Sequence, residues 1–211
     1  MAGIGIGPDD FEIFAIADPD ERCRAVESRL QPKLLALGRE LSGGLSRVVG
    51  RELCSQYGKL SRRRGTAPDE AFVAFAESTK TLRGVPYLAL SVTRGQLHAR
   101  VAVRGECERA TDMRRAVERE ASSLARKGKP FRKLRHYIGW NYEELPEVAP
   151  ATSPAFWQEI AEELAPSAPG RMSGADLGIA WSREEARSLS VGDVLGAFRD
   201  IAPLYKLLVN A

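Results

Sequence analysis

The stretch Leu97–Arg104, LHARVAVR, decides the fold class because apolar side chains alternate along it with polar, charged or small ones. Successive side chains of a β-strand point to opposite faces, so this period of two predicts a strand with one face toward the core and its basic residues on an outward face. A second strand candidate, Tyr87–Thr93, precedes it, and Arg94-Gly95 between the two marks a tight connection. The two strands are therefore predicted to form an antiparallel hairpin.

Helical spacing lies on both sides of this hairpin. Leucines recur at three- and four-residue intervals from Leu30 to Leu41, which predicts a long amphipathic helix over residues 20–41 with Asp18 as its N-cap and a bend or break at Pro32. Ser42-Gly43-Gly44 is expected to end that helix. Further helices are expected over residues 45–53, 111–125, 154–164 and 190–208, the last interrupted at Pro203. Further strands are expected over residues 71–76, 134–140 and 177–181.

These elements predict an α+β protein, with a small antiparallel sheet packed by several helices in a single compact domain. The domain is expected to cover residues 11–211, and the glycine-rich residues 1–10 are expected to form a flexible leader. No run approaches the ~18 consecutive apolar residues of a membrane-spanning helix. No secretion signal is recognised, and the three cysteines lie far apart, which favours reduced thiols. The expectation is a soluble, cytoplasmic protein.

Positive charge is concentrated in the middle of the chain. The net charge is only +3, but residues 91–135 hold thirteen Lys and Arg against five acids. The planar guanidinium of arginine can hold a phosphate or carboxylate through two parallel hydrogen bonds. We therefore expect an anion-binding surface made of loop and strand residues. Its candidate members are Arg62, Arg63, Lys80, Arg83, Arg100 and Arg104. The alternative is that these cations pair with neighbouring acids or are simply solvated.

Catalytic motifs are sparse. His98 and Tyr87 are the candidates for proton transfer, and an ordinary surface histidine is the alternative for His98. The sequence offers too few histidines and cysteines at suitable spacing for a zinc site, so neither a metal nor another cofactor is expected. It shows no nucleophile elbow, Walker loop or dinucleotide fingerprint. Trp140, Trp157 and Trp181 fit either a ligand pocket or the core.

Three short runs stand out, namely Asp10–Phe14, Arg29–Leu34 and Val73–Ala76, together with shorter segments at Arg62-Arg63, Pro68-Asp69, Pro86, Ile179–Ser182 and Pro203–Lys206. In these segments the sequence resembles the YktB-like family of bacterial proteins of unknown function. This sequence departs from the family pattern at Leu60 and Tyr87, where histidines are typical, and at Arg64–Ala67. The resemblance implies a compact mixed α/β fold in a bacterial cytoplasmic protein, and it implies no reaction.

Three function hypotheses follow. The first is an anion-binding module for a phosphate-bearing partner, with nucleic acid ahead of a nucleotide or phosphorylated metabolite. The second is a metal-independent small-molecule enzyme in which Arg62 and Arg63 position an acidic substrate while His98 or Tyr87 transfers a proton. The third is an interaction or regulatory protein without a ligand. The sequence does not fix the oligomeric state.

Overall fold

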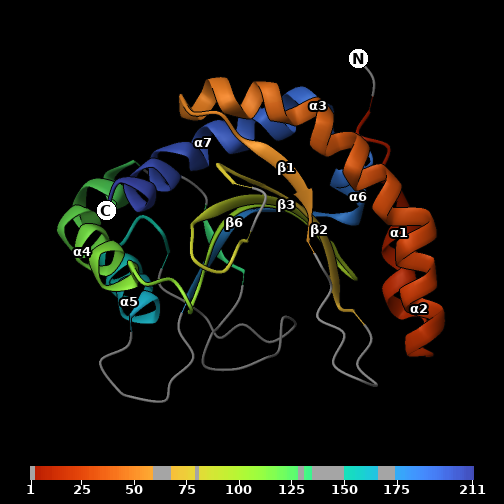
Figure 1. Ribbon diagram of the computed structural model, residues 1–211, viewed down its shortest axis with the longest axis horizontal. Helices are drawn as coiled ribbons and strands as arrows, with labels where there is room; N and C mark the ends of the chain where they lie inside the picture. The colour runs from red at the N-terminus through yellow and green to blue at the C-terminus, as the bar shows by residue number, and fades with distance from the viewer. Residues whose placement is uncertain (1–2, 59–67, 79–80, 128–130, 135–149, 166–173) are drawn as a thin grey trace. The chain divides into compact units, whose positions relative to one another are not determined.

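The computed structural model describes residues 3–58, 68–78, 81–127, 131–134, 150–165 and 174–211. Its helical elements are α1 (Pro8–Glu12), η1 (Ile13–Ala15), α2 (Pro19–Ala25), η2 (Val26–Leu30), α3 (Gln31–Val49), α4 (Ala110–Arg126), α5 (Pro154–Leu164), α6 (Arg183–Ala186) and α7 (Val191–Asn210). Its strands are β1 (Cys54–Tyr57), β2 (Glu70–Ala76), β3 (Tyr87–Thr93), β4 (Gln96–Arg104), β5 (Arg132–Lys133) and β6 (Gly174–Ser182). The predicted α+β class is confirmed (Figure 1).

The strands form one sheet in the order β1-β2-β3-β4-β6-β5. β1 pairs antiparallel with β2, and β5 pairs antiparallel with β6. β3 and β4 are neighbours, as predicted for a hairpin, and β4 lies inside the sheet because β6 covers its other edge. The predicted strand over residues 134–140 falls almost wholly outside the described residues, whereas β5 lies just before it.

The helix predicted over residues 20–41 begins as expected but differs from its prediction at Pro32 and at its end. Asp18 is the N-cap as expected, since its side chain accepts a hydrogen bond from the Glu21 N–H at 2.7 Å. At Pro32, which has no N–H to donate, the bend takes the form of the π-helical turn η2 directly before α3. The predicted end at Gly43-Gly44 is wrong, because α3 continues to Val49. A Cβ on Gly44 would lie 2.9 Å from the Leu195 side chain, so the glycine serves close packing against α7.

The boundaries of other elements also differ from their predictions. The separate helix predicted over residues 45–53 is wrong, because α3 includes this segment as far as Val49 and strand β1 begins at Cys54. α7 runs through Pro203 without interruption. Pro203 and Arg199 are both exposed, so the carbonyl that proline leaves without an N–H partner lies on the solvent side of the helix.

Residues 1–10 were predicted as a flexible leader, and the structure describes residues 3–10 of that segment. Ile4 and Ile6 are buried, with 5% and 3% of their surface exposed. The Ile4 N–H donates a hydrogen bond of 3.1 Å to the Leu189 carbonyl, and α1 begins at Pro8. Burial of two isoleucines explains why the glycine-rich segment is ordered despite its composition. The extent of a single domain over residues 11–211 stays a prediction.

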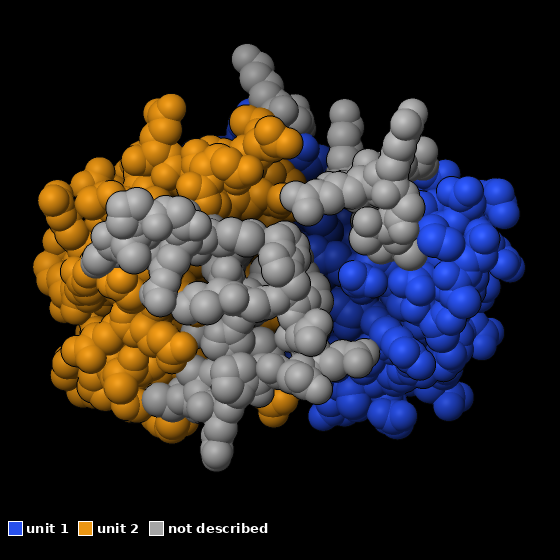
Figure 2. Space-filling model, turned by 90° about the horizontal axis from the view of Figure 1, so that it is seen from below, with its two compact units in different colours: residues 1–79, 89–99, 180–199 blue, residues 80–88, 100–179, 200–211 orange. Residues whose placement is uncertain are grey.

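Contacts within the chain group it into two compact units (Figure 2). Unit 1 comprises residues 1–79, 89–99 and 180–199, and unit 2 comprises residues 80–88, 100–179 and 200–211. In unit 1, α3 packs on β1 and β2, and Phe75 of β2 meets Phe198 of α7 edge to face at 6.0 Å. Each unit therefore has its own apolar packing.

In unit 2, α4 and α5 pack side by side (Figure 1). Trp157 lies fully buried in this layer, in edge-to-face contact with Phe156 and Phe131. Its indole N–H donates a hydrogen bond of 2.8 Å to the Ala151 carbonyl. Trp157 is therefore a core residue, and Phe131 packs against it. Within the described residues, no helix combines the length and the apolar character needed to cross a membrane.

Candidate anion-binding site

Strand β4 alternates as predicted, but both of its faces are buried from Leu97 to Val103. The prediction of an outward basic face is therefore wrong for His98 and Arg100, whose exposed fractions are 4% and 1%. The sequence pattern shows which residues share a face but not what covers that face. Arg104, at the end of the strand, is half-buried.

Arg100 is held by a buried carboxylate from β6. Its Nη1 lies 2.5 Å from Oδ2 of Asp176, and the two side chains are only 2% and 3% exposed. The Asp176 carbonyl accepts a hydrogen bond of 2.8 Å from the Leu134 N–H, which anchors its backbone. Removing two charges from water costs several kcal/mol per ion in a typical protein, roughly offset by their attraction and hydrogen bonding. The pair therefore places a fixed guanidinium inside unit 2.

Small residues flank this pair along both strands. On β4, Ala102 lies between Arg100 and Arg104 on the same face, because every second residue points the same way. On β6, Gly174 and Gly178 lie two residues to either side of Asp176 on its own face. We call Arg100, Ala102, Arg104 and Asp176, with these two glycines, the polar face of unit 2.

His98 belongs to a separate hydrogen-bonded chain in unit 1. Its Nε2 lies 3.1 Å from Oε1 of Gln96, and its Nδ1 lies 3.5 Å from Oγ of Ser91. Because an amide oxygen can only accept, Nε2 donates the hydrogen bond to Gln96. Ser91 and Tyr87 are also buried, at 0% and 2% exposed. Neither His98 nor Tyr87 lies at the surface, so the geometry adds no support for the enzyme hypothesis.

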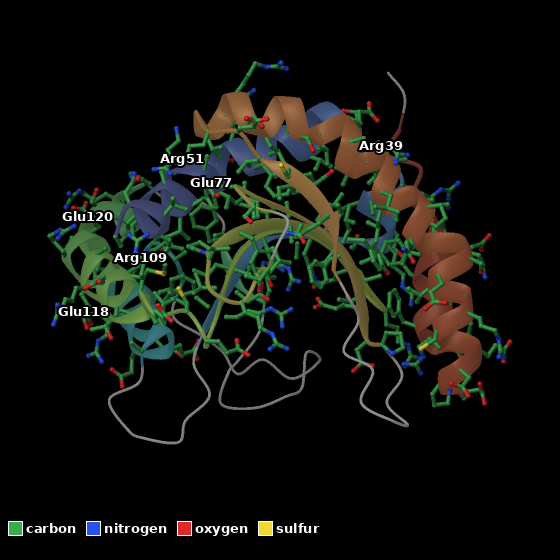
Figure 3. The ribbon with its side chains drawn as sticks, in the orientation of Figure 1. Arg39, Arg51, Glu77, Arg109, Glu118 and Glu120 are labelled. Carbon is green, nitrogen blue, oxygen red and sulfur yellow. The ribbon has the colours of Figure 1, made fainter. Side chains whose placement is uncertain are left out.

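Much of the basic run is paired with acids. Arg114 of α4 contacts Glu118 at 2.8 Å and Glu162 of α5 at 3.1 Å. The hydrogen bond that Arg114 donates to Glu118 raises the pKa of its guanidinium. Arg115 and Arg119 contact Asp112 and Glu120 at 3.7 and 3.9 Å. Figure 3 labels Glu118 and Glu120 on α4, and it shows Arg51 near Glu77, to which it is bound at 2.9 Å in unit 1. Arg114, Arg115 and Arg119 of α4 therefore each lie beside a carboxylate, which offsets part of the positive charge of this helix.

Four candidate anion-binding residues remain, and only one of them lies within the described residues. Arg62, Arg63 and Lys80 lie outside the described residues. Arg83 is exposed, and its backbone N–H donates to the Thr81 hydroxyl at 3.1 Å. Sequence reasoning missed Asp176, although a lone acid between two glycines in an otherwise apolar strand was a usable signal. In the described part of the chain, no three His, Cys, Asp or Glu side chains gather as metal ligands would.

Comparison with known proteins identifies the family. The family model described as "Domain of unknown function (DUF1054)" matches residues 7–165. The chain is 32% identical over 88 residues to UPF0637 protein OB1420 of Oceanobacillus iheyensis, a match that covers 42% of this chain and 43% of the relative. It is 28% identical over 83 residues to a UPF0637 protein of Bacillus thuringiensis, covering 39% and 40% of the two chains. The chain thus spans about two fifths of the length of these curated relatives. The match over residues 7–165 establishes that the chain belongs to the DUF1054 family, which confirms the YktB-like resemblance.

Proposed function

We propose that the protein is an anion-binding module whose ligand is a phosphate-bearing small molecule, bound at the polar face of unit 2. The observation that carries the proposal is the buried Arg100, oriented by Asp176 at 2.5 Å. A guanidinium fixed before the ligand arrives loses little conformational freedom on binding, and its charged hydrogen bonds are about twice as strong as neutral ones. Such a group suits recognition of a phosphate.

The ligand is proposed to be small because of where the cations lie. Arg100 is 1% exposed, and a duplex backbone on the protein surface does not reach a guanidinium at that depth. Three arginines of α4 that a polyanion would meet at the surface, Arg114, Arg115 and Arg119, contact acids as described above. A nucleotide or a phosphorylated metabolite therefore replaces nucleic acid as the favoured partner.

Arg104 is the residue proposed to contact the ligand together with Arg100. It lies on the same face of β4 with only Ala102 between them on that face, and it is half-buried. Arg62, Arg63, Lys80 and Arg83 stay predicted anion-binding residues, and the present proposal does not depend on them. A cytoplasmic location is also proposed, since the three cysteines are free thiols and nucleotides are abundant in that compartment.

The test is isothermal titration with inorganic phosphate and with adenosine monophosphate, using the wild type, Arg104→Ala and Arg119→Ala. Arg119 is the matched control because it is an exposed arginine of α4 that meets Glu120 at 3.9 Å. Loss of a charged hydrogen bond costs about 1.5–3 kcal/mol, so Arg104→Ala should weaken binding by roughly ten- to a hundredfold. Arg119→Ala should bind as the wild type does. Failure of the wild type to bind either probe, or equal weakening in both variants, would refute the proposal.

A further inference from the structure

We propose that strand β1 is an interaction surface, on which a second copy of this chain adds its own β1 to form a twofold-symmetric, antiparallel dimer. The proposal does not rest on the anion-binding function, because β1 lies in unit 1 and Arg100 lies in unit 2. β1 comes first in the strand order β1-β2-β3-β4-β6-β5, so it has β2 on one side and forms an edge of the sheet on the other. An edge strand presents backbone N–H and C=O groups that another strand can bind.

The register with β2 shows which backbone groups of β1 point toward the edge. Because Tyr57 pairs with Val73, Gly58 lies opposite Phe72. The Gly58 N–H donates a hydrogen bond of 2.9 Å to the Phe72 carbonyl, so these two residues form a hydrogen-bonded pair. Hydrogen-bonded pairs alternate with non-hydrogen-bonded pairs along an antiparallel ladder. The N–H and C=O groups of Tyr57 and Ser55 therefore point away from β2, toward the edge.

The structure leaves these edge groups open. Leu53 has the same orientation as Ser55, and its N–H donates to Oγ of Ser46 at 3.0 Å. Among the described residues, the edge-facing backbone groups of Ser55 and Tyr57 have no such partner. All four residues of β1 are half-exposed, whereas the neighbouring strand β2 is buried over Ala71–Ala76. The edge of β1 is therefore accessible in the part of the chain that the structure describes.

The residues of β1 are compatible with pairing to an identical strand. Cys54–Tyr57 contains no proline and no charged residue, and its register with β2 runs without a bulge. Proline, lysine and bulges are devices by which proteins protect their edge strands. At the other edge of the sheet, β5 is only two residues long and includes the exposed cation Arg132. The sheet thus has one protected edge and one edge without these protections.

A second copy fits the edge of β1 because Ser55 and Tyr57 are placed symmetrically about Gln56. When the twofold axis passes at Gln56, Ser55 of each copy lies opposite Tyr57 of the other, and each of these pairs exchanges both of its N–H···O=C bonds. A twofold dimer uses the same surface on both copies and is the commonest closed assembly. A contact through one short strand predicts a weak, reversible dimer.

A charge at position 56 tests this arrangement, because the twofold axis places Gln56 opposite its own copy. Gln56→Lys and Gln56→Glu are measured separately and as an equimolar mixture by sedimentation equilibrium, from about 1 to about 500 µM. The matched control pair is Ser188→Lys and Ser188→Glu, at an exposed position of unit 1 between α6 and α7. Urea midpoints of the four variants report on their folding.

The wild type should dimerise reversibly in this range. Like charges directly opposite each other should weaken the dimer of either Gln56 variant alone about tenfold, and mixing the two variants should restore wild-type affinity or exceed it. The Ser188 variants should dimerise as the wild type does, alone and mixed. Recovery on mixing excludes misfolding as the cause of the weakening. A wild type that is monomeric throughout, or equal affinity of the Gln56 variants alone and mixed, would overturn the proposal.

Amide hydrogen exchange of the wild type gives a second readout that needs no variant. The N–H groups of Ser55 and Tyr57 should exchange more slowly at high protein concentration than at low, because the dimer protects them. The N–H of Leu53, already bound to Ser46, should exchange at a rate that does not depend on concentration. If Ser55 and Tyr57 exchange independently of concentration while the protein dimerises, the contact lies elsewhere and pairing through β1 is wrong.

Discussion

At the scale of single residues, the Arg100–Asp176 pair determines which changes the polar face tolerates. Both charges lie away from water, so replacing either side chain removes an ion-pair partner from a buried charge. The hydrogen bond between them offsets the free energy of burying the two charges, whereas burying a single charge would destabilise the fold. The two residues should therefore behave as one unit toward mutation.

Arg100→Ala is predicted to lower the free energy of unfolding by about 3–5 kcal/mol, because it leaves Asp176 uncompensated. The double variant Arg100→Met/Asp176→Leu should be close to the wild type or above it in stability, since apolar residues of similar volume replace the pair without a buried charge. Urea unfolding of the single and double variants measures both effects. A small loss in Arg100→Ala together with a large loss in the double variant would contradict this account.

The environment of Tyr57 in β1 predicts that the stability of the protein depends on pH in the alkaline range. Among the described residues its buried hydroxyl has no hydrogen-bond partner. Burial, and secondly the negative charge of Glu27, raise the pKa of Tyr57 to about 12. The unfolded chain would release this proton near its ordinary pKa of about 10, so the stabilising contribution is complete below that pH and is lost as pH rises toward 12.

Tyr57→Phe should therefore show a shallower loss of stability between about pH 10 and 12 than the wild type. Urea midpoints measured across that range test this, with absorbance at alkaline pH as a second readout of tyrosine ionisation. Identical slopes for the two proteins would show that Tyr57 does not carry the effect.

At the scale of elements, two glycines of α3 have opposite roles. A Cβ on Gly38 would lie 2.7 Å from a methyl group of Val73 and 3.2 Å from Cβ of Ser55, because this residue faces β1 and β2. Gly43, on the same helix, has no atom within 4 Å of its Cβ position. Gly38 thus allows α3 to pack closely on the sheet, whereas Gly43 has no such packing role.

Gly38→Ala is predicted to destabilise the protein by about 1–3 kcal/mol through overpacking. Gly43→Ala should instead stabilise it by about 0.5–1 kcal/mol, because alanine loses less backbone entropy in a helix. Thermal or urea unfolding of both variants gives the signs directly. Similar effects of the two substitutions would mean that helix propensity, rather than contact with the sheet, governs both sites.

The N-terminal segment offers a further test at this scale. Ile6 is 3% exposed, so Ile6→Ala should cost about 2–5 kcal/mol of stability, as large-to-small changes in a core do. A residue in a flexible leader would change stability by less than about 0.5 kcal/mol. The half-buried Ile16 is the comparison, and Ile16→Ala should have an intermediate effect in the same unfolding experiment.

At the scale of the whole molecule, net charge and its local pairing govern binding to polyanions. The chain carries only +3, and Arg100, Arg114, Arg115 and Arg119 each contact a carboxylate. We expect weak binding to single-stranded and duplex DNA that disappears by physiological salt, because the small net positive charge displaces few phosphate counterions. Fluorescence anisotropy across salt concentrations measures this. Tight binding with a steep salt dependence would restore the nucleic-acid hypothesis.

The sequence by itself determined the local features of this protein. The period of two in β4 and the connection before it predicted neighbouring strands, and Asp18 with Pro19 predicted the start of α2. Family membership also followed from short runs of sequence. These properties depend on residues within a few positions of each other, so local spacing is sufficient to encode them.

Only the tertiary structure decided what covers each face. Arg100 is buried because Asp176, 76 residues away, neutralises it, and β4 is internal because β6 returns beside it. α3 continues through Gly43-Gly44, and Gly44 lies against Leu195 of a helix far along the chain. Burial and charge pairing are properties of elements that meet in space, and no local period in the sequence specifies that partner.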